Sequence, residues 1–471
     1  MIIPILTKPN YEDYFANSFS EAVLDALFYE KFQYSPAKGI DRANGRAFKN
    51  DAKNALAIAS KKVIQKTYRF SPYLQQLRLK GRGKVPRVIA IPTIRDRMVL
   101  KQLKECLAFA FPDCVPKNIA NSYVRKLAED LRKLDPANTY VCGCDIIDFY
   151  GSINRKRLLK IINDRIDHEE TLVLLHRCLA TPIVPLGVNR SGYSTYTNDT
   201  GVPQGLAVSN LLAAIYLQDV DKRMALRPVS YIRYVDDVLI YGGEDDVRKA
   251  YDSMKRSLKI RNLEMHPMGS GKTYIKKLAD GFSYLGYVFE KGNITVRESS
   301  IEHLLHSIAA QFSDYLHNRD RRLRNFSYLT KDRVKAIFVH ELNERITGAL
   351  SEGKRFGWVA YFSQITDLTL LHRLDSAVNG MFRRMNDFSG KAPGDLKRFA
   401  RAYYEMKFNP SGGYVRDYDR IKTSAEKIVF LAGRGRIDPT KPLNDEEIDS
   451  IYERYKRRSL SKMLADEGII Y

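Results

Sequence analysis

Residues 231–242 have the sequence YIRYVDDVLIYG, in which two adjacent carboxylates, Asp236 and Asp237, lie between apolar, β-prone segments. These segments predict a short β-hairpin that displays both acids at its tight turn. Adjacent carboxylates repel each other. A divalent cation such as Mg2+ neutralises them through oxygen ligands and keeps water positions open for a phosphate substrate. Taken alone, this stretch could also be a solvated turn. The choice between a metal site and a solvated turn depends on the other motifs of the chain.

The composition is that of a basic globular protein. The chain has 471 residues, 44% of them hydrophobic and 11% aromatic, which is sufficient for two or three domains with sizeable cores. Lys and Arg outnumber Asp and Glu by 77 to 55, giving a formal charge of +22. Such an excess predicts a polyanionic partner bound in a salt-dependent way, the alternative being a basic surface that only confers solubility.

The cysteines and the apolar segments predict a cytoplasmic protein without a membrane partner. The five cysteines form no CxxC pair, which argues against a disulfide scaffold or a zinc ribbon and fits a reducing compartment. The first residues lack the basic and apolar regions of a signal peptide. No apolar run approaches the roughly 18 residues of a membrane span.

Two further motifs present polar side chains at defined positions. Residues 139–153, TYVCGCDIIDFYGSI, predict a strand that ends at Asp145 and a helix that begins soon after. A carboxylate at the end of a buried strand is costly without a partner or a metal. In VPQG (202–205), Pro203 and Gly205 set a tight turn that presents the amide of Gln204. Alone, this turn is weak evidence for a functional site. Its position in the sequence between Asp145 and the Asp-Asp hairpin makes that evidence stronger.

Two basic segments flank these motifs. Residues 75–95, QQLRLKGRGKVPRVIAIPTIR, predict two strands around a Gly-rich basic turn; such a hairpin can close over a triphosphate with Arg87, or can simply be solvated. Residues 261–278 predict a helix end and a Gly-rich turn that carries Lys272, for which a surface lysine is the alternative. His266 in the same segment is expected to be structural or on the surface, because no second ligand is spaced to join it.

Beyond residue 300 the sequence becomes helical and very basic. Aromatic residues are interleaved with Arg and Lys, as in GMFRRM (380–385) and YERYKRRSLSK (452–462), which favours a nucleic-acid groove over merely solvated faces. FGWVAYF (356–362) holds the single tryptophan and is expected to anchor a helical core.

Taken in order, these motifs resemble those of reverse transcriptases. The blocks RVIAIPTIRDR, CDIIDFYGSI, GVPQGLAVSNLLAAIYL, YVDD, NLEMHPMGSGKT and FSYLGYVF follow the family order over about residues 75–290. The resemblance implies an α+β right-hand polymerase fold. Its parts would be N-terminal helices and fingers (1–137), a palm with an antiparallel sheet (138–300), and a helical thumb with a helical C-terminal extension (301–471).

The resemblance also implies roles for individual residues. DNA synthesis is an in-line attack of a 3′-hydroxyl on the α-phosphate of a deoxynucleoside triphosphate, assisted by two Mg2+ ions, with Mn2+ as a substitute. The metal ligands would be Asp145, Asp236, Asp237 and the backbone carbonyl of Ile146. The nucleotide-binding residues would be Lys80, Arg87, Arg95, Gln204 and Tyr150, the last as the steric gate against ribonucleotides. Lys272 would protonate the leaving pyrophosphate, and Tyr284, Leu285 and Gly286 would form the primer grip.

Within the family, the chain resembles a bacterial lineage similar to group II intron and retron enzymes. It lacks a Cys- or His-rich endonuclease tail, reads SNLL where intron enzymes usually read SPLL, and lacks the Asn-Ala-x-x-His signature of retrons. Its layout is most similar to that of defence-associated and abortive-infection reverse transcriptases. That likeness implies a dedicated noncoding RNA, a DNA product, a role in antiphage defence, and further association with a second copy or a partner protein.

Two alternatives remain open from the sequence. One is a template-independent or protein-primed DNA polymerase on the same fold, since the 29 tyrosines offer hydroxyls for priming. The other is an RNA-binding maturase or scaffold that does not synthesise DNA.

Overall fold

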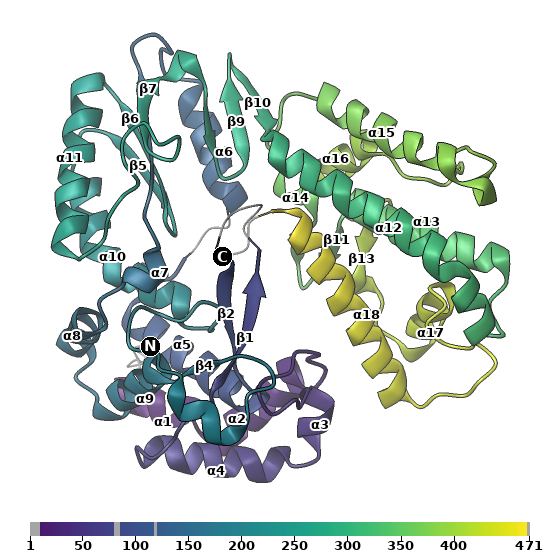
Figure 1. The fold of residues 1–471 in the computed structure, drawn as a ribbon, viewed down its shortest axis with the longest axis horizontal. Coiled ribbons are helices and arrows are strands. Elements are labelled where there is room, and N and C mark those ends of the chain that lie inside the picture. The colour runs from purple at the N-terminus through teal and green to yellow at the C-terminus, as the bar shows by residue number, and fades with distance from the viewer. Residues whose placement is uncertain (1–9, 80–84, 117–119, 469–471) are drawn as a thin grey trace, which may run out of the picture. The chain divides into compact units, whose positions relative to one another are not determined.

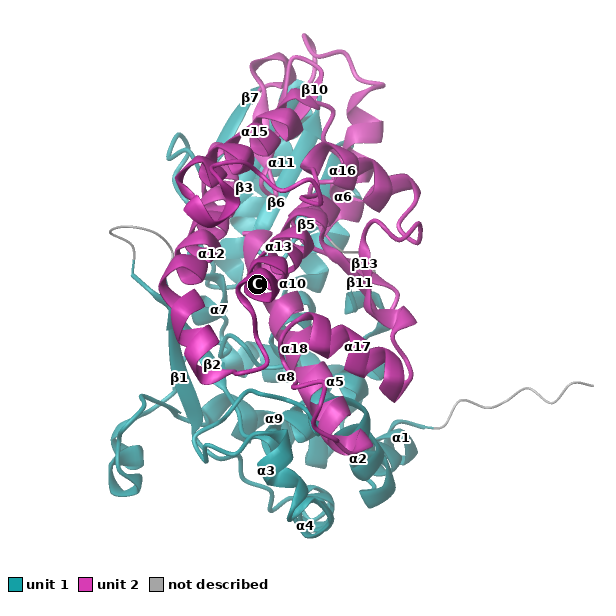
Figure 2. Ribbon diagram, turned by 90° about the vertical axis from the view of Figure 1, so that its right-hand side faces the viewer, with its two compact units in different colours: residues 1–117, 140–276 teal, residues 118–139, 277–471 magenta. Residues whose placement is uncertain are grey.

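The computed structural model describes residues 10–79, 85–116 and 120–468. The chain forms two compact units (Figures 1 and 2). Unit 1 comprises residues 1–117 and 140–276, and unit 2 comprises residues 118–139 and 277–471. The fold class is α+β, as expected: helices surround small, mainly antiparallel sheets.

The central sheet of unit 1 has the strand order β5-β6-β3-β7. Its strands are β3 (Tyr140–Asp145), β5 (Ser230–Tyr234), β6 (Asp237–Gly242) and β7 (Tyr274–Lys277). β6 pairs antiparallel with both β5 and β3, which confirms the hairpin predicted over residues 231–242. Residues 238–241 of β6 are all buried, which explains why the strand is continuously apolar and does not alternate.

Helices pack on this sheet through one hydrophobic core. α10 (Ser209–Ala225) and α11 (Glu244–Ile260) lie beside β5 and β6 (Figure 1), and Leu212, Ile240 and Met254 are buried together in the core. The other helices of unit 1 are α1 (Tyr11–Ser18), α2 (Glu21–Leu27), α3 (Gly45–Lys49), α4 (Ala52–Ile64), α5 (Ile94–Ala110), α7 (Phe149–Ser152), α8 (Arg155–Ile166) and α9 (Glu169–Ala180).

The second sheet of unit 1 contains the predicted basic hairpin. β1 (Tyr73–Arg78) pairs antiparallel with β2 (Arg87–Ile91), with Arg78 opposite Arg87, and β4 (Ile183–Val184) lies parallel to β1. The strands therefore confirm the hairpin. Its Gly-rich turn, which includes Lys80, lies outside the described residues.

Unit 2 is mostly helical. Its helices are α6 (Ala120–Leu131), α12 (Glu298–Asn325), α13 (Lys331–Thr347), α14 (Trp358–Tyr361), α15 (Thr369–Met381), α16 (Phe399–Phe408), α17 (Ser424–Gly433) and α18 (Asp445–Asp466). Trp358 is only 1% exposed and packs against the rings of Phe362 and Phe399, with centroids 4.9 and 6.1 Å away. The expectation that it anchors a helical core is confirmed.

Two small sheets complete unit 2. β8 (Phe282–Tyr284), β9 (Tyr287–Glu290) and β10 (Asn293–Val296) form one, and β11 (Ala349–Ser351), β12 (Lys354–Phe356) and β13 (Arg416–Asp417) form the other. Between β8 and β9, and again between β9 and β10, a two-residue turn has both φ angles positive, at Leu285–Gly286 and at Lys291–Gly292. Such turns match the twist of paired strands, so residues 282–296 form a three-stranded meander with two reversals.

The expected division into fingers, palm and thumb stays a prediction. The basic hairpin and the carboxylate-bearing sheet share unit 1, whereas residues 277–300 belong to unit 2. Among the described residues, no helix is both long enough and apolar enough to span a membrane.

Candidate active site

Three carboxylates meet at one end of the central sheet. Asp145 is the last residue of β3, and it lies directly opposite Asp237, the first residue of β6. Asp236 is the second residue of the two-residue turn between β5 and β6, and it directly precedes Asp237. The antiparallel register, which no single motif specifies, thus brings together acids that are far apart in the sequence.

A partly buried ion pair supports the turn that carries Asp236. Val235 has a φ of 58°, a left-handed conformation that is costly for a β-branched residue and persists only where the surroundings enforce it. Arg233 donates from Nη1 to the carbonyl oxygen of Val235 at 2.8 Å and from Nε to Oδ1 of Asp221 on α10 at 2.7 Å. The Tyr231 hydroxyl donates to the same Asp221 oxygen at 2.7 Å. Asp221 and Arg233 therefore hold the turn in its strained shape.

Asp236 lies where a negative charge is unfavourable. Its Oδ1 atom is buried and has no hydrogen-bond partner among the residues that the structure describes. Desolvation, followed by the charges of Asp237 and Asp145, raises the pKa of Asp236 to about 7. A cation placed here would lower that pKa and satisfy the buried oxygen.

A lysine and a histidine contact Asp145 from the segment before β7. Lys272 Nζ donates to Oδ2 of Asp145, and Nε2 of His266 lies 3.1 Å from the same ammonium and 3.6 Å from the same carboxylate oxygen. A β-bridge between Ile146 and Met265 positions the segment, and the His266 amide donates to the Asp145 carbonyl at 3.0 Å. The expectation for His266 missed this contact, because the bridge pairs residues far apart in sequence.

The donor set fits a divalent cation. Carboxylate oxygens, one of them buried without a partner, are the ligands that a hard cation such as Mg2+ takes. In the described part of the chain, no group of three or more His, Cys, Asp or Glu side chains is already arranged around a common metal position. Lys272 instead partly neutralises Asp145, so a bound cation would compete with this lysine.

Tyr150, the expected steric gate, is anchored through its hydroxyl. The Tyr150 hydroxyl donates to Oδ1 of Asn210 on α10 at 2.6 Å. Desolvation and the neighbouring charge of Asp236 raise the pKa of the phenol, which therefore stays neutral, while the positive charge of Arg87 acts in the opposite direction. Asn210 was not among the predicted site residues. The sequence clue to it was the motif SNLL, in which Asn210 takes the place of the proline that is usual in intron enzymes, and a proline side chain has no hydrogen-bond acceptor.

The Pro-Gln-Gly turn packs directly on β2. The Ala90 amide donates to the Gln204 carbonyl oxygen at 2.7 Å. Gly205 has a φ of 102°, and a Cβ at this position would lie 2.7 Å from Cγ2 of Ile89, so only glycine allows this approach. Arg87 at the start of β2 also lowers the pKa of Asp236 through its charge. The structure thus links Gln204 to the strand that carries Arg87.

Arg95 does not extend from its helix toward these carboxylates. It donates to Oδ1 of Asp96 at 3.1 Å and to the Ser71 hydroxyl at 3.2 Å. Asp96 is fully buried and also accepts a hydrogen bond from Tyr68 at 2.5 Å. The contacts give Arg95 a structural role at the base of the hairpin, and its contact with a triphosphate stays a prediction.

The expected primer-grip residues belong to unit 2. Leu285 and Gly286 form the tight turn between β8 and β9, and the Tyr361 hydroxyl donates to the Leu285 carbonyl at 3.0 Å. Tyr284 is buried at the end of β8. Their role with a primer stays a prediction.

Comparison with known proteins assigns a family to the central region. Residues 79–289, somewhat less than half of the chain, match the family described as reverse transcriptase (RNA-dependent DNA polymerase). No curated protein sequence matches the chain. Among solved structures, it is similar to apo telomerase from Candida tropicalis truncated from its C-terminal domain, with 14% identity and a TM-score of 0.38. That alignment covers 52% of this chain and 60% of the telomerase chain, and a likeness at this level carries no functional argument.

The family match includes Arg87, Tyr150 and Gln204 as well as the carboxylates and Lys272. Members of this family use divalent metal ions, nucleic-acid templates and deoxynucleoside triphosphates. The similarity to reverse transcriptases, which are RNA-directed DNA polymerases, therefore extends over residues 79–289.

Proposed function

We propose that this protein synthesises DNA on an RNA template with Mg2+ as its metal ion. The observation that carries the proposal is the meeting of Asp145, Asp236 and Asp237 at one end of the sheet, with a buried Asp236 oxygen that lacks a partner among the described residues. Two bound Mg2+ ions, for which Mn2+ can substitute, would supply charge stabilisation to the attacking and leaving oxygens. The carbonyl of Ile146 would be a further ligand.

The chain's own residues would bind and orient the nucleotide. Arg87 and Gln204 lie on linked segments and would contact the triphosphate and the nucleotide. Tyr150, fixed by Asn210, would occupy the space of a ribose 2′-hydroxyl and exclude ribonucleotides by steric conflict. Lys272, already hydrogen-bonded to Asp145, would donate a proton to the leaving pyrophosphate.

The biological setting is part of the proposal. The template is a dedicated noncoding RNA, the enzyme acts in the cytoplasm, its DNA product serves antiphage defence, and the protein associates with a second copy or a partner protein. The motif pattern and the long basic region after residue 300 support this assignment.

The test is deoxynucleotide incorporation by the purified full-length protein with Mg2+ and its co-purified RNA. Asp236→Ala with Asp237→Ala should abolish incorporation. The matched control is Asp245→Ala with Asp246→Ala, a second adjacent pair in the first turn of α11, and it should retain full activity. Products are sequenced with and without prior RNase treatment.

Each outcome selects one function. DNA that matches the co-purified RNA and disappears after RNase treatment supports templated synthesis. DNA that survives RNase, or whose mobility changes after protease digestion, supports the template-independent or protein-primed alternative. No product from the wild-type protein, despite bound RNA, supports the maturase or scaffold alternative.

A further inference from the structure

Unit 2 contains a polar pocket of about 200 Å³ that is separate from the three carboxylates in unit 1. Three helical segments and one turn contribute its lining: α12, α13, α18 and the turn after α17. The lining residues are Asp314, Asn318, Arg321, Arg322, Glu341, Arg436, Arg458 and Lys462. Five of the eight are basic, two are acidic and none is aliphatic or aromatic.

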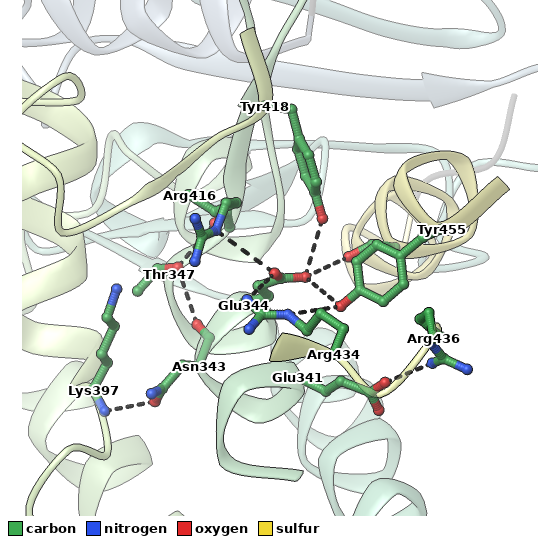
Figure 3. Close-up of polar contacts among 12 residues, drawn as sticks. Glu341, Asn343, Glu344, Thr347, Lys397, Arg416, Tyr418, Arg434, Arg436 and Tyr455 are labelled. Atoms are coloured by element: carbon green, nitrogen blue, oxygen red, sulfur yellow. Dashed lines mark hydrogen bonds and ion pairs between the residues drawn. The ribbon is translucent and has the colours of Figure 1, made fainter. Parts of the chain in front are cut away.

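Two of the basic residues are held in place by the two acids. Arg322 forms an ion pair with Asp314 at 3.2 Å, and Arg436 forms one with Glu341 at 2.7 Å. Figure 3 shows Arg436 directed toward Glu341. These pairs hold two guanidinium groups at the pocket, and each carboxylate of the lining is engaged in one of them.

The other three basic residues form no direct ion pair within the described residues. Arg321, Arg458 and Lys462 are exposed and make no ion pair or hydrogen bond within the part of the chain that the structure describes. Desolvation lowers the pKa of Lys462; the negative charge of Glu341 opposes this shift, and the positive charges of Arg458, Arg345 and Arg436 add to it. The cations therefore repel one another, and a bound anion would relieve that repulsion.

The wall of the pocket is rigid because a buried carboxylate joins α13 to α18. Glu344 of α13 accepts hydrogen bonds from Ser459 at 2.9 Å and Tyr455 at 3.3 Å, both on α18, and from Arg434 at 2.7 Å (Figure 3). Glu344 and Arg434 side chains are each 5% exposed. Arg458 and Lys462 of α18 are therefore presented from a helix that is joined to α13, which lowers the entropic cost of binding.

The lining selects for phosphate groups over nucleobases. Proteins that bind bases commonly stack them on aromatic rings, and the lining contains no aromatic ring. A backbone that tracks across a surface is bound by a stripe of cations, whereas here cations from three segments converge on one small volume. Guanidinium groups suit phosphate oxygens through paired hydrogen bonds.

We propose that this pocket binds a polyphosphate group, carried by a nucleoside triphosphate or by the 5′ end of a triphosphorylated RNA. Several adjacent phosphates match the converging cations in charge and in size. The proposal concerns unit 2 alone and does not depend on DNA synthesis in unit 1.

The test begins with inorganic tripolyphosphate titrated into the full-length protein by calorimetry in metal-free buffer. Arg458→Gln with Lys462→Gln should weaken binding by about tenfold or more, because two uncompensated cations are lost. Arg383→Gln with Arg384→Gln removes the same charge at an exposed site outside the pocket and should change affinity by less than about twofold. Arg87→Gln tests for binding at the candidate active site and should also have little effect.

Two further probes identify the source of the polyphosphate. If a nucleoside triphosphate binds as tightly as tripolyphosphate, and this binding is lost in the Arg458/Lys462 variant, the ligand is a nucleotide. A 5′-triphosphorylated RNA that binds at least about tenfold tighter than the same RNA with a 5′-hydroxyl, only when the pocket is intact, indicates an RNA end. Arg321→Gln provides a second pocket variant if the double substitution fails to fold.

Three results would overturn the proposal. They are unchanged tripolyphosphate binding in both pocket variants, an equal loss in the Arg383/Arg384 control, and a loss confined to Arg87→Gln. None of these results measures nucleotide incorporation, so the proposal of DNA synthesis is tested separately.

Discussion

Tyr150 and Asn210 are joined by a hydrogen bond that fixes the position of the Tyr150 ring. The two residues are 60 positions apart, and their side chains meet because α7 and α10 pack in the same core. Without the Asn210 acceptor, the Tyr150 ring would keep its volume and lose its fixed position. If the Tyr150 ring is a steric gate, discrimination against ribonucleotides depends on the hydrogen bond to Asn210 as well as on the volume of the ring.

Replacing Asn210 by Ala should reduce selection against ribonucleotides by about two- to tenfold, the range for one hydrogen bond. The measurement is the ratio of kcat/KM for deoxynucleotides to that for ribonucleotides. Tyr150→Phe removes the same bond from the other side and should have a similar effect. The double variant should be no worse than either single one; additive losses would show that the bond is not what positions the ring.

Glu467 makes stability depend on pH. Desolvation raises the pKa of this carboxyl to about 7, opposed by the hydrogen bond from the Gly357 amide at 3.1 Å and reinforced by the charge of Asp466. In the unfolded chain its pKa is about 4.3, so between the two values the folded state binds more protons and stability falls as pH rises. The loss is complete above the folded-state value.

Glu467→Gln keeps the acceptor for Gly357 and removes the titration. The stabilisation by this variant should be greater at about pH 8 than at about pH 5 by roughly 2 kcal/mol. Thermal unfolding at the two pH values measures it, with the exposed, surface substitution Asp245→Asn as the control. An identical gain at both pH values would contradict the assignment.

At the scale of elements, the hairpin β5–β6 depends on its neighbour α10. Asp221 of α10 binds Arg233 and Tyr231 of β5, and Arg233 in turn supports the left-handed Val235. The Arg233 side chain is 11% exposed. Removing its partner therefore leaves a largely buried charge uncompensated.

Asp221→Asn should lower stability by about 3 kcal/mol, the usual result of breaking a buried pair from one side. It should also lower kcat, because the turn that carries Asp236 loses its support. Replacing both partners, with Asp221→Leu and Arg233→Met, should restore most of the stability and little of the activity. The exposed pair of Lys160 and Asp164, 3.6 Å apart, offers Asp164→Asn as a control with almost no expected effect.

At the scale of the whole molecule, the charge of +22 governs association with nucleic acid. If about five backbone phosphates of a single strand are neutralised, affinity should fall about a hundredfold between about 50 and 200 mM salt. Fluorescence anisotropy with a labelled 5′-hydroxyl RNA measures the slope. An uncharged peptide nucleic acid of the same sequence should bind weakly and show almost no salt dependence; a flat slope for the RNA itself would contradict a phosphate-driven interaction.

Much of the fold near the site could be predicted from local patterns. The two apolar segments of residues 231–242, the strand that ends at Asp145 and the basic hairpin each have a short-range cause in side-chain patterning and turn chemistry. The second reversal of the meander over residues 282–296 depends on backbone conformations at Lys291 and Gly292 that side-chain periodicity does not reveal.

The sequence by itself determined which chemical groups are available: the acids of YVDD and CDIIDFY, the Gln204 turn, a reverse transcriptase pattern, and an excess of positive charge. Only the tertiary structure decided which of them meet. The contact of His266 with Asp145, the bond between Tyr150 and Asn210, and the commitment of Arg95 to Asp96 all follow from packing. The basic pocket of unit 2 has the same origin, since its residues span positions 314 to 462. The physical reason is that strand register and helix packing minimise exposed apolar area over the whole chain, and no short segment contains that information.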